Sequence, residues 1–229
     1  MDSHELAFAG ATQQARMLAN GAITAPALLE VYLERISRLD PQLRSYRVVL
    51  ADTAGAEATA AQARLDAGER LPLLGVPIAI KDDVDVAGEM TTYGTAAHGP
   101  ARSQDAEVVR RLRDAGAVII GKTAAPEMMV WSFTETLTFG ATRNPWNTDY
   151  TPGGSSGGSG TAVAAGLAPR RSDRTVWVRS GFRRRGAGCS GSSRSATGFL
   201  SHRMTARGTA CPSMVRWPGR WRTPPSFWM

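Results

Sequence analysis

Lys81 and the serines of a glycine-rich loop are the side chains of this sequence best suited to proton transfer and nucleophilic chemistry. Lys81 directly follows the apolar run VPIAI, and the carboxyl end of a strand is where α/β sheets usually carry functional groups. When protein rather than water surrounds a lysine, its charged form is disfavoured and the neutral amine can accept a proton. Taken alone, Lys81 is more simply interpreted as a solvated lysine that closes the strand.

The loop GGSSGG supplies Gly153, Gly154, Ser155 and Ser156. Its glycines tolerate backbone geometries that side chains forbid. Two other interpretations compete with a catalytic loop, a flexible linker and a phosphate-cradling loop. An apolar helix predicted over 161–168 argues against the linker. The loop also lacks the Lys-Ser/Thr ending of a P-loop and the spacing of GxGxxG.

Alternating helices and strands are predicted to position these groups. Thr24 and Pro26 predict the capped start of an amphipathic helix, whose apolar positions are Leu28, Leu29, Val31, Tyr32 and Ile36. Further helices are expected over 53–68 and 105–115, and strands over 75–80 and 117–120. This alternation favours an α/β sheet covered by helices on both faces.

Other features point to a cytoplasmic, soluble protein without a metal or organic cofactor. The opening residues MDSHE have no basic or apolar signal region, and no apolar run approaches the length of a membrane-spanning helix. His4 and His98 are far apart in the sequence and are expected at the surface. Asp82, Asp83 and Asp85 resemble a metal box but are better interpreted as turn residues after the strand.

The character of the chain changes after Pro169. Residues 1–169 carry a net charge of −5, whereas residues 170–229 contain 13 Arg, no Lys and one acid, and carry +12. Both cysteines and four of the six tryptophans also lie in this Arg/Ser/Trp-rich tail, without the periodicity that would bury them. The tail is therefore predicted to be disordered. Its charge alone would suggest binding to nucleic acid.

A shift of the reading frame near Pro169 explains the tail better. If one base was lost there, each original codon joins the last base of one present codon to the first two of the next. The single-codon residues then leave little choice: Trp177 followed by Val178 becomes Gly, and Trp217 followed by Pro218 becomes Ala. With free third bases elsewhere, the tail contains GSIRIP and, further on, GLFGLKP.

The body resembles the amidase signature family of Ser-Ser-Lys amidases. The resemblance rests on several motifs in one order: TAPALLEVYLERISRLDPQL, LLGVPIAIKDDVDVAG, DAEVVRRLRDAGAVIIGKT, FGATRNPW and TPGGSSGG. It covers only the N-terminal part of the family's domain, over 1–169. It therefore implies an amidase-signature fold with a mixed central sheet, incomplete in this chain.

The resemblance also implies the roles of the site residues. Lys81 acts as the base, and Ser155, which in the family follows a cis peptide bond, relays a proton between the lysine and a nucleophilic serine. Gly153, Gly154, Ser155 and Ser156 contact the substrate, with Ser156 in the hydrogen-bond network of the triad. Met129 falls where the family lines its pocket, although it could equally be core. The expected substrate is a small carboxylic acid amide, with no metal or membrane partner, and intact relatives are compatible with a homodimer.

The nucleophile is where this sequence departs from the family. In the restored frame its codon spans Val178 and Arg179, but position 179 of the present chain is arginine. The chain is therefore predicted to be inactive. Two alternatives stay open: the A subunit of a glutamine-dependent tRNA amidotransferase, and a non-enzymatic basic protein that binds nucleic acid, which the frame shift disfavours.

Overall fold

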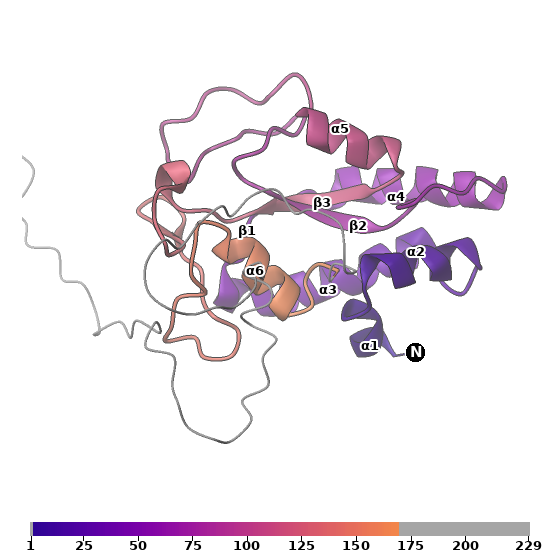
Figure 1. The fold of residues 1–229 in the computed structure, drawn as a ribbon, viewed down its shortest axis with the longest axis horizontal. Helices are drawn as coiled ribbons and strands as arrows, with labels where there is room; N and C mark the ends of the chain where they lie inside the picture. Colours follow the sequence, from indigo (N-terminus) through magenta and orange to yellow (C-terminus); the bar gives the residue numbers. More distant parts are fainter. Residues whose placement is uncertain (1, 170–229) are drawn as a thin grey trace, which may run out of the picture.

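A three-stranded mixed sheet organises the part of the chain that the computed structural model describes, residues 2–169 (Figure 1). Its strands in chain order are β1 (Tyr46–Val49), β2 (Pro77–Lys81) and β3 (Val118–Thr123). The spatial order is β1-β3-β2, so β3 is central, parallel to β2 and antiparallel to β1. The expected mixed α/β sheet is confirmed.

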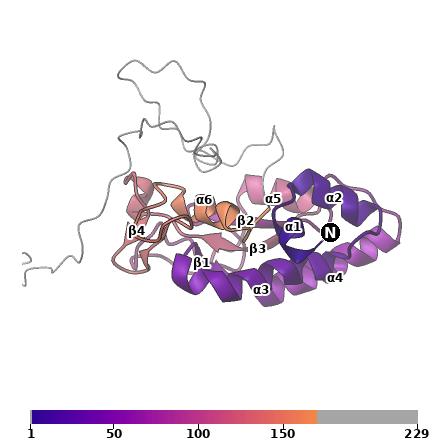
Figure 2. The ribbon, with the colours of Figure 1, turned by 90° about the horizontal axis from the view of Figure 1, so that it is seen from below.

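Helices lie on both faces of this sheet. They are α1 (Ser3–Ala7), α2 (Ala11–Ala19), α3 (Ala25–Leu43), α4 (Ala51–Asp66), α5 (Glu107–Asp114) and α6 (Gly157–Ala164). Helices α3 and α4 run along one face, and α6 lies on the other (Figure 2). The short elements are η1 (Glu127–Met129) and a two-stranded sheet of β4 (Glu135–Thr136) and β5 (Gly140–Ala141). Among residues 2–169, no helix combines the length and apolar character needed to span a membrane.

The start of α3 follows the prediction from Thr24 and Pro26. The Thr24 side chain accepts a hydrogen bond from the Ala27 amide at 3.3 Å, which satisfies a backbone donor that the first helical turn leaves free. Pro26 lies in that first turn, where its missing N–H costs nothing. Four of the five predicted apolar positions are buried, and Val31 is half-buried.

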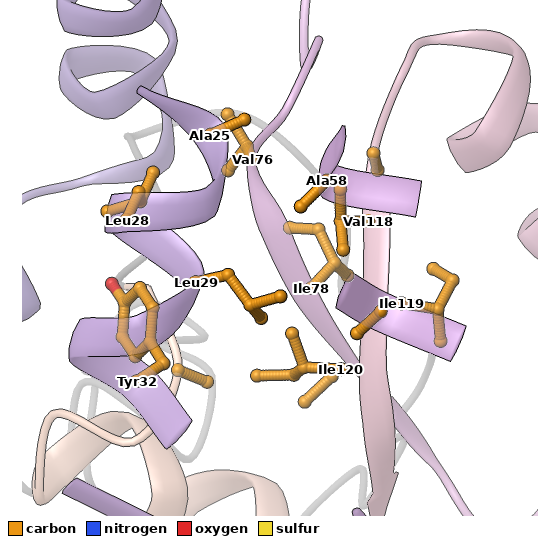
Figure 3. Packing of buried hydrophobic residues seen from close by; sticks show 14 of the residues in the cluster. Ala25, Leu28, Leu29, Tyr32, Ala58, Val76, Ile78, Val118, Ile119 and Ile120 are labelled. Atoms are coloured by element: carbon orange, nitrogen blue, oxygen red, sulfur yellow. The ribbon is translucent and has the colours of Figure 1, made fainter. Parts of the chain in front are cut away.

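The core fills the space between α3, α4 and the strands. Leu29 of α3 points toward the strands that carry Ile78 and Ile120 (Figure 3). Ala54, Ala58 and Ala61 of the alanine-rich α4 are also buried, and their small side chains let this helix approach β3 closely. Burial on both faces explains why β2 and β3 read as continuous apolar runs rather than alternating ones.

The predicted boundaries differ from the observed ones mostly by two or three residues. Helix α4 begins two residues before the predicted 53–68, and β3 extends three residues beyond the predicted 117–120. Strand β1 was not predicted. The helix predicted over 161–168 is wrong in position, because α6 begins at Gly157 and ends at Ala164. Its glycines are poor helix formers, and only packing against the sheet shows that they are helical.

The division of the chain at residue 169 remains a prediction. The predicted disorder and altered frame of 170–229 fall on residues outside the described part. Within residues 2–169, one hydrophobic core joins the N-terminal helices, the sheet and the segment after α6, from Leu6 to Ala168.

Candidate active site

The Lys81 amine and the Ser155 hydroxyl lie in direct contact. Lys81 is the last residue of β2, and only 8% of its side chain is exposed. Its Nζ donates a hydrogen bond to Ser155 Oγ at 2.9 Å, and it lies 3.4 Å from Oδ2 of the partly exposed Asp83. This distance allows proton transfer between the amine and the hydroxyl, so the geometry suits the acid–base chemistry suggested by the two motifs.

The loop before α6 has the unusual backbone that its glycines permit. Gly153 has φ of +87°, and the Gly154–Ser155 peptide bond is cis. A Cβ on Gly154 would lie 2.7 Å from both the N and the O of Phe133, closer than real side chains approach backbone. Glycine is therefore required at 154 by the close approach of the Phe133 main chain.

Thr134 ties the two sides of this loop together. Its hydroxyl donates to the Gly153 carbonyl at 2.9 Å and accepts from the Gly157 amide at 3.0 Å. Beyond the loop, α6 packs tightly on the sheet end, where a Cβ on Gly158 would lie 2.4 Å from the Ala124 carbonyl oxygen. The Ser155 position thus depends on a side chain and on main chain from distant segments.

Two side chains at the end of the sheet, Lys81 and Thr123, contact the α6 region from the same face of the sheet. Lys81 and Thr123 are register partners on the parallel strands β2 and β3. Lys81 reaches Ser155, and the Thr123 hydroxyl lies 2.6 Å from that of Ser159, one helical turn further along. The strand register therefore places the Lys81 amine and the Thr123 hydroxyl side by side, each in contact with one serine of the α6 region.

The structure places the other predicted site residues as follows. Ser156 is the N-cap of α6, and its carbonyl accepts from the Gly160 amide at 3.0 Å, while its side chain makes no capping hydrogen bond. Met129 ends η1 with φ of +60° and is half-buried, so it is not a residue of the buried core. Substrate contacts of Met129, Ser156 and the two glycines before Ser155 stay predictions.

A buried ion cluster adjoins Lys81, and the sequence analysis missed it. Asp82 is 1% exposed, and its Oδ1 lies 3.0 Å from Nζ of the fully buried Lys122. Arg47 lies 3.3 Å from Asp82 and 3.3 Å from Glu89. The Thr92 hydroxyl donates to the second carboxylate oxygen of Asp82. Asp82 does lie in the predicted turn, but its main feature is this pairing with two cations.

The amino-acid composition contains a feature that could have identified Lys122. The chain contains 27 Lys and Arg residues, and only Lys81 and Lys122 among them are lysines. Both lie at the ends of neighbouring strands and both are buried. Burial lowers the pKa of Lys122, and the nearby Asp82 carboxylate opposes that effect. The rarity of lysine in the chain therefore marked Lys122, like Lys81, as a residue worth considering, since a compact ammonium and a planar guanidinium are not interchangeable.

The described residues offer little for metal binding. Among residues 2–169 there is no group of three or more His, Cys, Asp and Glu side chains close enough to hold a metal ion. His4 and His98 are exposed, as expected. Asp83 pairs with Lys81, and Asp85 lies 3.1 Å from Arg102, so the aspartates after β2 face cations rather than one another.

A surface hollow of about 430 Å³ lies beside the end of α3, and it does not include the Lys81–Ser155 contact. It is lined by Ile36, Ser37, Asp40, Pro41, Arg44, Tyr46, Arg47 and Phe139. A smaller space of about 20 Å³ reaches Asp82 and Thr134. The contact between Lys81 and Ser155 is therefore separate from the larger hollow.

Solved structures share this fold. A bacterial aryl acylamidase described as a member of the amidase signature family superimposes with a TM-score of 0.66 and 28% identity. The match covers 71% of this chain and 34% of the acylamidase. The arrangement of residues 2–169 is thus that of one part of an amidase signature enzyme.

Sequence relatives agree. AmiB2 of Mycobacterium tuberculosis, whose name describes an amidase, is 76% identical over 169 residues, which are 74% of this chain and 37% of AmiB2. The A subunit of the glutamyl-tRNA(Gln) amidotransferase of Halorhodospira halophila is 50% identical over 150 residues, which are 65% of this chain and 31% of that relative. The matched part of this chain spans about a third of the length of these relatives, 37% of AmiB2 and 31% of the amidotransferase subunit.

The family profile called Amidase matches residues 27–170, a stretch that contains Lys81, the glycine-serine loop and all three strands of the main sheet. A match over more than half of the chain, together with the shared fold and the 76% identity, leads to one conclusion. This chain belongs to the amidase family.

Proposed function

We propose that the intact form of this protein hydrolyses a small carboxylic acid amide to a carboxylate and ammonia or an amine, through an acyl-serine intermediate. The observation that carries the proposal is the 2.9 Å hydrogen bond between Lys81 Nζ and Ser155 Oγ. It joins two of the five motifs on which the family resemblance rests. The family resemblance assigns Lys81 as the base, and its side chain, 8% exposed at the strand end, directly contacts the proposed relay serine.

In this mechanism the nucleophilic serine attacks the amide carbonyl while its proton moves to Ser155 Oγ. The Ser155 proton passes at the same time to the neutral Lys81 amine. The proton then returns to the departing nitrogen, and water attacks the acyl-enzyme with the same two residues as base and relay. The steps require no metal or organic cofactor.

The present chain is proposed to be inactive, because Arg179 stands where the restored frame has the nucleophilic serine. The family match ends at residue 170, next to the proposed frame shift near Pro169, which supports this interpretation. Resequencing the codons for Gly166 to Val178 from independent DNA tests it. One additional base would restore the frame, whereas a confirmed present reading would leave a broken gene.

Activity of a frame-restored protein tests the mechanism. We expect the restored protein to hydrolyse simple amides and to be labelled by a serine-reactive fluorophosphonate probe, and we expect neither result for the present chain. Lys81→Ala and Ser155→Ala should each lower kcat by at least about a thousandfold. Glu69→Gln, at an exposed ion pair far from the site, serves as the control and should leave kcat unchanged. Probe labelling of the purified present chain would contradict the proposed inactivity.

A second candidate function is ammonia delivery by the A subunit of a glutamine-dependent amidotransferase. The 50% identity to such a protein favours it, while the higher identity to AmiB2 favours the amidase. Glutamine-dependent activity that appears only with partner subunits would support the amidotransferase. Hydrolysis of simple amides by the isolated restored protein would support the amidase, for which we also propose a cytoplasmic location.

A further inference from the structure

The three strands of the main sheet are joined at one end by buried charges. Arg47 lies in β1, Lys122 lies in β3, and Asp82 follows Lys81 at the end of β2. The carboxylate of Asp82 is the common partner of the two cations. Each strand therefore contributes one charged group to a single cluster beside Lys81.

Both carboxylate oxygens of Asp82 are engaged. Oδ1 lies 3.0 Å from Lys122 Nζ and 3.3 Å from Arg47 Nη2. Oδ2 accepts from the Thr92 hydroxyl and lies 3.3 Å from Arg47 Nε. The Asp82 amide also donates to the Thr123 carbonyl at 3.1 Å. Side chain and main chain of Asp82 are thus held from several sides.

Alternation along the strands separates this cluster from the site hydroxyls. Successive side chains of a strand point to opposite faces of its sheet. Lys81 and Thr123 reach Ser155 and the α6 region, whereas their neighbours Asp82 and Lys122 meet each other. Fixing Asp82 therefore fixes the backbone from which the Lys81 side chain leaves, without occupying the space around its amine.

The cluster also holds the segment that supports η1. Lys122 Nζ donates to the Met90 carbonyl at 2.8 Å, and the Tyr93 amide donates to the Asp82 carbonyl at 3.3 Å. The Tyr93 carbonyl in turn accepts from the Met128 amide at 2.8 Å. Asp82 is therefore linked both to the strand that carries Lys81 and to the segment next to Met129.

Energetics argue for a role beyond stability. Buried ion pairs cost much of their attraction in lost hydration, and apolar side chains of similar volume often stabilise a protein equally well. Two cations and two carboxylates are nevertheless buried or nearly buried here, with balanced formal charge. Directional charged hydrogen bonds differ from apolar contacts in specifying one geometry.

We propose that Asp82 is a positioning residue: held by Arg47 and Lys122, it fixes the end of β2 so that the Lys81 amine meets the Ser155 hydroxyl. The inference rests on the proposed function only in taking Lys81 as the base. Lys122, Arg47 and Thr92 engage both carboxylate oxygens of Asp82, so Asp82 is not proposed to carry the transferred proton. It acts through the place that it gives to Lys81.

The two-lysine composition allows a direct test on the chain as it exists. Amine acylation of the folded protein, quantified by mass spectrometry, resolves Lys81 from Lys122, and lysine-specific isotope labelling gives two side-chain NMR signals. We expect Asp82→Asn to raise the acylation rate of Lys81 by at least about tenfold, the effect of losing a hydrogen bond to a charged group. The Lys81 NMR signal should shift as well.

Thr92→Val is the milder second variant, because it removes the hydrogen bond to Asp82, together with the one that the Thr92 hydroxyl accepts from the Gly94 amide at 3.2 Å, and leaves both ion pairs of Asp82. We expect a rise in Lys81 acylation of about threefold from the loss of the bond to Asp82. Glu57→Gln is the matched control for stability. Glu57 accepts from the Ile119 amide at 2.9 Å, near the opposite end of β3, so its loss should leave the Lys81 signal in place.

These variants separate failure of the positioning role from failure of the proposed function. If Asp82→Asn and Thr92→Val leave Lys81 as in the wild type, or if Glu57→Gln changes it equally, the positioning role is wrong. Should Asp82→Asn fail to fold, Thr92→Val alone tests the positioning role: faster acylation of Lys81 supports it, and an unchanged rate overturns it. Ser155→Ala tests the proposed function separately: it should shift the Lys81 signal and leave the Lys122 signal unchanged. An unmoved Lys81 signal in that variant would refute the Lys81–Ser155 contact itself.

Discussion

Gly158→Ala should destabilise the protein because it forces α6 away from the sheet. The added Cβ would lie 2.4 Å from the Ala124 carbonyl oxygen, 2.5 Å from the Ala124 nitrogen and 2.7 Å from the Ser45 carbonyl oxygen. All three contacts are with main chain, so no side-chain rotation can relieve them. Overpacking of this kind costs about 1–3 kcal/mol.

Helix propensity opposes this cost, since alanine is favoured over glycine inside a helix by up to about 1 kcal/mol. The net expectation is a loss of about 1–2 kcal/mol in the free energy of unfolding. Gly55→Ala is the matched control. Gly55 lies within α4, and a Cβ there meets nothing within 4 Å, so the substitution should stabilise by about 0.5–1 kcal/mol.

Urea unfolding followed by circular dichroism measures both variants. The midpoint should fall for Gly158→Ala and rise for Gly55→Ala, with similar slopes against urea concentration. A gain in stability for both variants would show that α6 does not pack on Ala124 as described. The position of Ser155, which precedes α6, would then have lost one of its supports, and the contacts with Thr134 and Phe133 would remain.

Two further predictions concern contacts that anchor the segment after α6. Arg35→Met should lower the free energy of unfolding by about 2–4 kcal/mol, because the buried Arg35 Nε donates to the Gly166 carbonyl at 2.8 Å. Arg38→Met is the control. Arg38 lies on the exposed face of the same helix, so its substitution should change the urea midpoint little. Burial raises the pKa of Tyr46 well above its ordinary value, and its hydroxyl donates to the Leu167 carbonyl at 2.8 Å. The folded state therefore requires the neutral phenol, so stability present below about pH 10 is lost as the pH rises further. Tyr46→Phe should be less stable at pH 8 but lose less between pH 8 and pH 11, and equal losses in urea midpoint would contradict this.

Local patterns predicted the elements whose signals lie within one segment. Thr24 and Pro26 predicted the start of α3, and the apolar runs predicted β2 and β3, because capping and burial depend on residue types at fixed spacing. Strand β1 was missed because its four residues have no strong pattern and are ordered by pairing with β3. Helix α6 was misplaced because its glycines suit a helix only against the sheet.

The sequence by itself determined the family, the identity of Lys81 and Ser155 as candidate groups, and the change of character after Pro169, since these follow from residue types and their order. Tertiary structure alone decided that the amine and hydroxyl of these two residues lie 2.9 Å apart. It also decided that Lys122 and Arg47 share Asp82 behind them. Such contacts join segments that are distant in the sequence, and they depend on strand register and helix docking. The burial of a turn aspartate such as Asp82 cannot be predicted from local sequence, because it depends on which distant segments pack around it.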